Sequence, residues 1–271
     1  MHILLESERY KQCFYQKEGT GFPVILLHGF GENGSIFKYQ IEDLKHHYTV
    51  IIPDLPGSGR SALCDEAMSM ELLADYVYKI ILQEKIEKVI LFGHSMGGYA
   101  ALAFAEKYPD NLVAFGLLHS SAYEVDAAKK ENRKKSIRLI QNEGKEIFLK
   151  AMIPNLYSES SKLKLQKEMD FHLTIALDIS SDSLIAYYNA MINRPDRTHV
   201  LKNNNLPVLF VIGKEDNAIP YNDMLAQSTM PKMSYIELLE GIGHTGMLEY
   251  PEKVNDTLNN FCKYVLEDKI A

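Results

Sequence analysis

Short apolar runs rich in β-branched residues alternate along this chain with longer segments whose apolar residues recur at helical spacing. Runs of the first kind predict strands buried on both faces, as in a parallel sheet covered by helices. We therefore expect an α/β fold with a mostly parallel sheet of about eight strands and helices on both faces. The predicted strands cover residues 2–6, 12–16, 24–27, 50–52, 89–92, 113–118, 208–212 and 235–239, and the first two form an antiparallel hairpin.

Helical periodicity fills several of the intervals between these strands. Residues 69–84 repeat apolar side chains at helical spacing, and a helix-compatible stretch over residues 99–108 follows a predicted strand. Pro251 suits the first turn of a last helix over residues 251–266.

One long interval departs from the alternation. Between residues 122 and 205 no convincing strand occurs, only helix-like segments. An all-helical insert in an alternating chain suggests a lid over the edge of the sheet. We therefore expect a single domain over residues 1–271 that contains a helical lid insert at residues 122–205. The helix-like segments lie around residues 127–142, 145–152, 161–177 and 183–192.

Charge argues against a nucleic-acid-binding surface. The chain has 29 Lys and Arg against 36 Asp and Glu, a formal net charge of −7, and no dense basic stripe. One basic cluster occurs on a predicted helix, interleaved with Glu131, and such a pattern is typical of a solvated helix face. The cluster consists of Lys129, Lys130, Arg133, Lys134 and Lys135.

The remaining composition indicates a cytoplasmic protein without a cofactor. The first residues lack a secretory pattern, and no apolar run reaches membrane-spanning length. Cys13, Cys64 and Cys262 are scattered and odd in number, which indicates reduced thiols. Histidines and carboxylates show no metal-binding spacing, and neither a dinucleotide fingerprint nor a P-loop is present, so we expect no metal and no cofactor.

A G-x-S-x-G pentapeptide marks the candidate nucleophile. Residues 93–97 read Gly-His-Ser-Met-Gly, directly after a predicted strand and before a helix. In this context the serine lies on a strained strand-to-helix turn, where Gly93 and Gly97 let the flanking backbones approach closely. Ser95 is therefore the candidate nucleophile.

A serine hydroxyl needs a base to take its proton, and the base needs an acidic group to orient it. His244 lies in a glycine-rich loop after the last predicted strand, and Asp216 follows the strand before it. Because catalytic groups gather beyond the carboxyl ends of parallel strands, we expect Ser95, Asp216 and His244 to meet. Two other acids compete with Asp216, namely the adjacent Glu215 and Asp126, which lies beyond an earlier strand.

The chain order Ser, Asp, His on this architecture resembles the α/β-hydrolase fold superfamily, and in particular a small serine esterase-like member. Residues 93–98 resemble its nucleophile elbow, and residues 27–31 (Leu-His-Gly-Phe-Gly) resemble its oxyanion-hole loop. Residues 54–61 are similar to a segment common among the smaller esterase-like members. The resemblance covers nearly the whole chain.

The resemblance also implies roles for the neighbours of the three catalytic candidates. The backbone N–H groups of Phe30 and Met96 are the expected donors to an oxyanion. His28, Gly29 and His94 are expected to support the site structurally, without transferring a proton.

The implied activity is hydrolysis of a carboxylic ester of a small apolar substrate by water. A serine at the elbow argues against the dehalogenase and epoxide-hydrolase branches, which need a carboxylate nucleophile. Hydrolysis of a carbon–carbon bond, thioester or lactone, acyl transfer and perhydrolysis use the same triad and stay open, as does a hydrolase-fold ligand-binding protein with slow turnover. Residues of the insert that could line an apolar acyl pocket, or only pack, are Phe148, Met152, Tyr157, Met169, Phe171, Tyr187, Tyr188 and Met191.

Overall fold

A computed structural model describes residues 2–267 of the chain, and its centre is one eight-stranded sheet. The strands are β1 (His2–Leu4), β2 (Phe14–Glu18), β3 (Pro23–Leu27), β4 (Thr49–Pro53), β5 (Val89–His94), β6 (Leu112–Leu118), β7 (Val208–Gly213) and β8 (Ser234–Leu239). Their spatial order is β1-β2-β4-β3-β5-β6-β7-β8. The pairs β1–β2 and β2–β4 are antiparallel, and every later pair is parallel. The predicted α/β fold is confirmed.

Twelve α-helices occur within residues 2–267. They are α1 (Lys38–Leu44), α2 (Met70–Gln83), α3 (Met96–Lys107), α4 (Ala127–Glu143), α5 (Lys145–Met152), α6 (Glu159–Lys164), α7 (Gln166–Leu177), α8 (Ser181–Asn193), α9 (Thr198–Asn203), α10 (Tyr221–Gln227), α11 (Gly246–Glu249) and α12 (Pro251–Glu267). Short 3-10 helices lie at Gly34–Phe37, Pro109–Asn111 and Ile153–Leu156.

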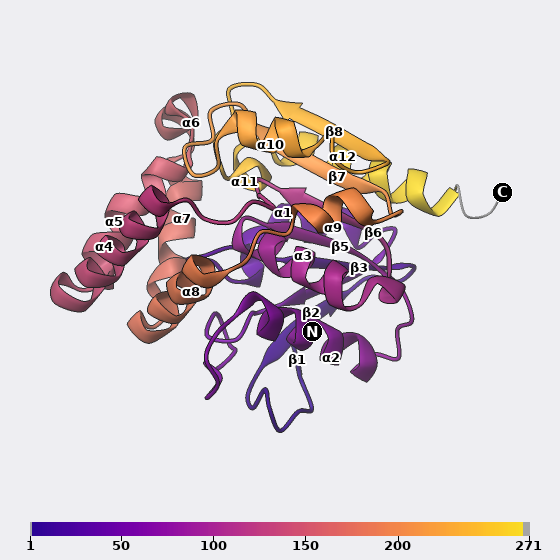
Figure 1. Cartoon of the computed structure of the whole chain (residues 1–271), viewed down its shortest axis with the longest axis horizontal. Coiled ribbons are helices and arrows are strands. Elements are labelled where there is room, and N and C mark those ends of the chain that lie inside the picture. Colours follow the sequence, from indigo (N-terminus) through magenta and orange to yellow (C-terminus); the bar gives the residue numbers. More distant parts are fainter. Residues whose placement is uncertain (1, 268–271) are drawn as a thin grey trace.

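Helices cover the two faces of the sheet as separate layers (Figure 1). Helices α2, α3 and α9 pack together, and α1, α11 and α12 form a second group. Alternation along β5 shows that the groups lie on opposite faces. The Phe92 ring lies 5.9 Å from that of Phe261 in α12, whereas the next residue, Gly93, adjoins Gly97 in α3.

The hydrophobic pattern locates the long elements well and the short ones poorly. Each predicted strand has a counterpart in the sheet, and the helix predicted over residues 69–84 is α2, with Ser69 accepting the N–H of Leu72 as its N-cap. The helix predicted over residues 161–177 is wrong in detail, because α6 ends before Leu165 and α7 begins after it, and the φ of −113° and ψ of 41° at Leu165 interrupt the helix. Helices α1, α9, α10 and α11 were not predicted, since four to seven residues carry too little periodic signal.

The segment between β6 and β7 contains helices and no strand in the described structure. Helices α4 to α8 project beyond the sheet, on the left of Figure 1. Helix α9, by contrast, packs beside α3, and the adjacent Arg197 donates to Glu106 of α3 at 2.9 Å. The role of this insert as a lid stays a prediction.

Candidate active site

Ser95 occupies the turn between β5 and α3 in a strained backbone conformation. Its φ is 49° and its ψ is −114°, which a residue with a Cβ seldom adopts. Neighbouring elements hold the turn, since the Ser95 N–H donates to the Leu118 carbonyl at 2.9 Å and Ser120 Oγ donates to the Ser95 carbonyl at 2.7 Å. Every residue from 89 to 105 is buried except Ser95, which is partly exposed. The turn therefore presents this one hydroxyl to solvent.

The glycines around Ser95 are explained by backbone packing. A Cβ on Gly93 would overlap the Gly97 carbonyl, and a Cβ on Gly97 would overlap the Leu27 carbonyl. A Cβ on Gly98 would overlap the Ser120 side chain. The start of α3 therefore lies directly against β3 and β5, and only glycine fits there.

His244 and Asp216 form a buried hydrogen-bonded pair. His244 Nδ1 lies 2.8 Å from Asp216 Oδ2, and Asp216 Oδ1 accepts the N–H groups of Ala218 and Ile219 at 2.8 and 2.9 Å. Burial alone would lower the pKa of His244, but the Asp216 carboxylate raises it above the usual 6.5. The same pairing, against the effect of burial, lowers the pKa of Asp216 well below its ordinary value.

The competing acids lie elsewhere. Glu215 is exposed, and Asp126 caps α4 by accepting the Lys129 N–H at 2.7 Å.

A residue that the sequence did not single out, His119, lies next to the His244–Asp216 pair, with its Nδ1 3.5 Å from Asp216 Oδ2. His119, Asp216 and His244 stand close enough to share a metal ion. A 2.8 Å distance between His244 and Asp216 is that of a charge-assisted hydrogen bond, which is the interpretation we adopt.

The loop after β3 lies against the Ser95 turn. A Cβ on Gly29 would stand 3.2 Å from Ser95 Cβ and 3.0 Å from His94 Nδ1. Neither the Phe30 nor the Met96 backbone N–H donates to another residue in the described part of the chain. Neither amide is therefore committed to a hydrogen bond within the described structure.

His28 holds this loop in place. Its Nε2 accepts the Leu55 N–H at 3.0 Å and lies 2.8 Å from Ser58 Oγ. The proton consequently resides on Nδ1, which lies 2.9 Å from the Gly29 carbonyl oxygen. Both ring nitrogens are engaged, so the His28 ring connects the loop after β3 with the one after β4.

A buried carboxylate, Glu32, lies behind the loop and was not anticipated from the sequence. It accepts the Gly29 N–H at 2.6 Å and faces His94 Nδ1 at 3.0 Å. His172 of α7 lies farther away, with its Nε2 3.8 Å from Glu32 Oε1. Burial alone would raise the pKa of Glu32, but its interactions with His94, His172 and the Gly29 N–H lower it to about 2.

Ser95 and His244 line one cavity of about 350 Å³. Of the eight candidate pocket residues in the insert, Met152, Tyr188 and Met191 line it. Phe148 packs behind them, 5.8 Å from the Tyr188 ring. Phe30 stacks on Tyr188 at 4.3 Å. The insert therefore supplies part of the wall that faces Ser95.

Polar residues that the sequence did not place here also line the cavity, namely Glu32, Lys129, Asn132, Arg133, Ser136 and Asn217.

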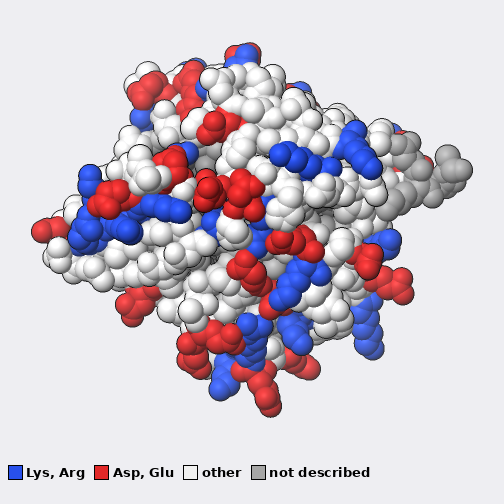
Figure 2. Space-filling model, in the orientation of Figure 1, with Lys and Arg blue, Asp and Glu red and all other residues white. Residues whose placement is uncertain are grey.

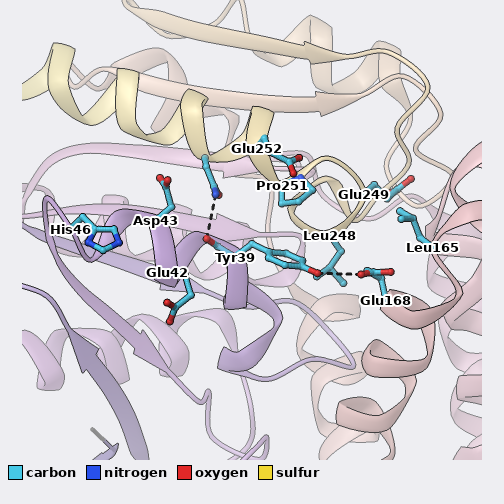
Figure 3. A pocket seen from close by; sticks show the side chains of 11 residues that line it. Tyr39, Glu42, Asp43, His46, Leu165, Glu168, Leu248, Glu249, Pro251 and Glu252 are labelled. Carbon is cyan, nitrogen blue, oxygen red and sulfur yellow. Dashed lines mark hydrogen bonds between the residues drawn. The ribbon is translucent and has the colours of Figure 1, made fainter.

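A larger cavity, of about 580 Å³, lies between α1, the insert and the start of α12. Figure 3 shows its acidic lining and the hydrogen bond between Tyr39 and Glu168. The Tyr39 hydroxyl donates to Glu168 Oε1 at 3.1 Å. Neither Ser95 nor His244 lines it. Size alone therefore does not locate the chemistry, and the smaller cavity is the candidate active site.

Several known proteins are similar to this chain over most of its length. A family model described as the alpha/beta hydrolase fold matches residues 23–251. The chain is 28% identical to Lipase 3 of a Moraxella species over 89% of this chain and 76% of that protein. It is 26% identical to the AB hydrolase superfamily protein YisY of Bacillus subtilis, covering 95% of this chain and 97% of the relative.

The fold is also similar to that of a solved structure. A thermophilic esterase from Thermogutta terrifontis superposes with a TM-score of 0.90 at 29% identity, over 98% of both chains. Within residues 2–267, no helix combines the length and the apolar character needed to cross a bilayer.

Proposed function

The chain belongs to the α/β-hydrolase fold family, in which similar members include an esterase and a lipase, and on that premise we propose that it hydrolyses carboxylic esters through an acyl-enzyme on Ser95. The observation that carries this proposal is the 2.8 Å contact between His244 Nδ1 and Asp216 Oδ2, made beside the cavity that holds Ser95. Because Nδ1 is occupied by Asp216, Nε2 is the atom of His244 left to act on the serine.

The reaction begins when the Ser95 hydroxyl attacks the ester carbonyl carbon and passes its proton to His244 Nε2. The carbonyl electrons move onto oxygen, where the N–H groups of Phe30 and Met96 stabilise the negative charge. His244 then gives the proton to the departing alkoxide, and the C–O bond to the alcohol breaks. Asp216 stabilises the imidazolium throughout.

Water completes the cycle. His244 removes a proton from the water as it attacks the acyl-enzyme, and returns that proton to Ser95 Oγ when the acid leaves. Thioester or lactone hydrolysis and acyl transfer to an alcohol would use the same groups, so a panel of leaving groups and acceptors distinguishes them.

The test is hydrolysis of a short 4-nitrophenyl ester by the wild-type protein and by Ser95→Ala. We expect the variant to lose the activity while it keeps its melting temperature. Equal turnover by both proteins would refute a serine mechanism at this position.

A further inference from the structure

One face of α4 lines the cavity that holds Ser95, and this face is polar and basic. Lys129, Asn132, Arg133 and Ser136 contribute to the wall and follow the i, i+3, i+4, i+7 spacing of a single helical face. Apolar side chains line the same cavity, among them Met152, Tyr188 and Met191. The lining of the cavity therefore combines basic and apolar side chains.

The sequence interpretation of this basic cluster as a solvated face is only partly correct. Lys134 and Lys135 are exposed, as a solvated face requires, whereas Lys129 and Arg133 are partly buried at the cavity. Figure 2 shows Lys and Arg side chains gathered on the left, over α4, with acidic side chains among them. The composition of α4 does not decide which of these basic residues face the cavity. The tertiary structure shows that Lys129 and Arg133 do.

The two cations at the cavity lack a carboxylate partner. Arg133 Nη1 donates to the Met191 carbonyl at 3.2 Å, a neutral acceptor that holds the guanidinium without supplying a negative charge. Across residues 2–267, no carboxylate oxygen lies within 4.0 Å of a side-chain nitrogen of Lys129 or Arg133. Removing a cation partly from water without a counter-charge costs free energy, and an anion bound beside the cation offsets that cost.

A third cation reinforces the positive charge. The Arg194 guanidinium carbon lies 3.9 Å from the centre of the Tyr99 ring, and Arg194 Nη1 is buried with no hydrogen-bond partner in the described structure. Burial alone would raise the pKa of Tyr99, but the charges of Arg194, Arg133 and Lys129 lower it. Arg194 lines a small pocket that shares Lys129 and Arg133 with the cavity.

Three acids line the same small pocket as these cations. Glu124, Asp126 and Asp223 line the small pocket but form no ion pair with the three cations at 4.0 Å or less, among the residues described. Glu32, the carboxylate in the wall of the Ser95 cavity, is paired with His94 at 3.0 Å. The basic face of α4 therefore remains available to an anion in the cavity.

We propose that the substrate carries a carboxylate besides its scissile ester, and that Arg133 and Lys129 bind this carboxylate. A guanidinium can donate two parallel hydrogen bonds to such a group, and the ammonium adds a mobile charge. The proposal rests on ester hydrolysis at Ser95 and changes the expected substrate from a neutral apolar ester to an anionic one.

The test compares esters matched in length that differ in one charge. Mono-4-nitrophenyl glutarate places the carboxylate in the acyl part, and 4-nitrophenyl pentanoate is its neutral partner. The butyrate ester of 4-hydroxybenzoate places the carboxylate in the leaving group, and the butyrate ester of 4-hydroxybenzamide is its neutral partner. We expect kcat/KM to favour the anion about tenfold to hundredfold in one of the pairs, the range for a charge-assisted hydrogen bond, with the difference mainly in KM.

Arg133→Gln should abolish this preference, and Lys129→Gln should reduce it. Lys134→Gln is the matched control, because it removes the same charge from an exposed position of the same helix. Raising the salt concentration should also reduce the preference. A wild-type protein without preference in either pair, or a preference that survives in Arg133→Gln, overturns the proposal.

Binding to Ser95→Ala separates this proposal from the proposed function. We expect glutarate to raise the melting temperature of Ser95→Ala more than glutaramide does, and Arg133→Gln in that background to remove the difference. If esters are not hydrolysed but glutarate still binds through Arg133, the proposed hydrolysis fails and the anion site stands. If hydrolysis depends on Ser95 but glutarate and glutaramide behave alike, only the anion site fails.

Discussion

His94 Nε2 lies 2.9 Å from the main-chain carbonyl oxygen of His244, so the residue before the Ser95 turn holds the loop that carries the candidate base. The other ring nitrogen of His94 faces Glu32 Oε2 at 3.0 Å, and Glu32 accepts the Gly29 N–H at 2.6 Å. A carbonyl oxygen and a carboxylate are both acceptors, so each ring nitrogen of His94 faces an acceptor. His94 and Glu32 thus connect the loops that carry the candidate nucleophile, base and oxyanion donors.

The choice of acid gives a first prediction. Asp216→Asn should lower kcat/KM for a 4-nitrophenyl ester by about three to four orders of magnitude, because His244 loses its orientation and the partner of its cationic form. Glu215→Gln is the matched control, since it neutralises the adjacent but exposed acid, and it should change the rate little. Steady-state kinetics of both variants decide between them, and the opposite ranking would move the acid to Glu215.

The pH profile gives a second prediction. Ester hydrolysis requires His244 without a proton on Nε2, and Asp216 raises the pKa of His244 above 6.5. The rate should therefore be low at acidic pH, where the imidazole is protonated, and should rise with pH through a midpoint above 6.5. In Asp216→Asn the residual activity should show a lower midpoint, because the negative charge is gone. A midpoint that the substitution leaves in place would contradict the assignment of this titration to His244.

Glu32 gives a prediction about stability. Its folded-state pKa of about 2 lies below the ordinary 4.5, so its ionisation stabilises the fold above pH 4.5, and this contribution disappears as the pH falls from 4.5 towards 2. Glu32→Gln should lower the free energy of unfolding at pH 7 by about 2–4 kcal/mol and flatten its decline between pH 4.5 and 2.

Urea unfolding measured across this pH range tests the prediction. Glu42→Gln is a suitable control, because Glu42 is exposed and pairs with Lys45 three residues along the chain. An unchanged pH dependence in Glu32→Gln would show that Glu32 is not the ionised group inferred from its contacts.

Close packing at the Ser95 turn gives a fourth prediction. A Cβ on Gly97 would overlap the Leu27 carbonyl, so Gly97→Ala should displace the start of α3 from β3. We expect an overpacking cost of about 3 kcal/mol, a melting temperature lower by about 5–10 °C, and a large loss of esterase activity. Thermal unfolding followed by circular dichroism measures the first effect. A variant as stable and active as the wild type would show that the turn tolerates a side chain there.

The sequence predicted the sheet and the three catalytic candidates because each leaves a local signal. Buried parallel strands are short continuous apolar runs. Ser95, Asp216 and His244 each lie in the turn or loop that follows such a run. The resemblance to a known family then added the loop at Gly29 and Phe30.

The remaining polar residues of the site could not be predicted in this way. Glu32 is a single acid in a loop, and its pairing with His94 and His172 joins positions far apart in the chain. Lys129 and Arg133 belong to a basic run whose inward face is set by how α4 packs, which periodicity in a polar helix does not reveal.

The most direct test of the central claim is covalent labelling with a fluorophosphonate, followed by peptide mapping by mass spectrometry. The serine oxygen displaces fluoride from phosphorus, so the label marks an activated nucleophile. We predict one adduct per chain on the peptide that contains Ser95, no adduct in Ser95→Ala, and wild-type labelling in Ser160→Ala, where the replaced serine is exposed on the insert. An adduct on another residue, or equal labelling of Ser95→Ala, would contradict the assignment of Ser95 as the nucleophile.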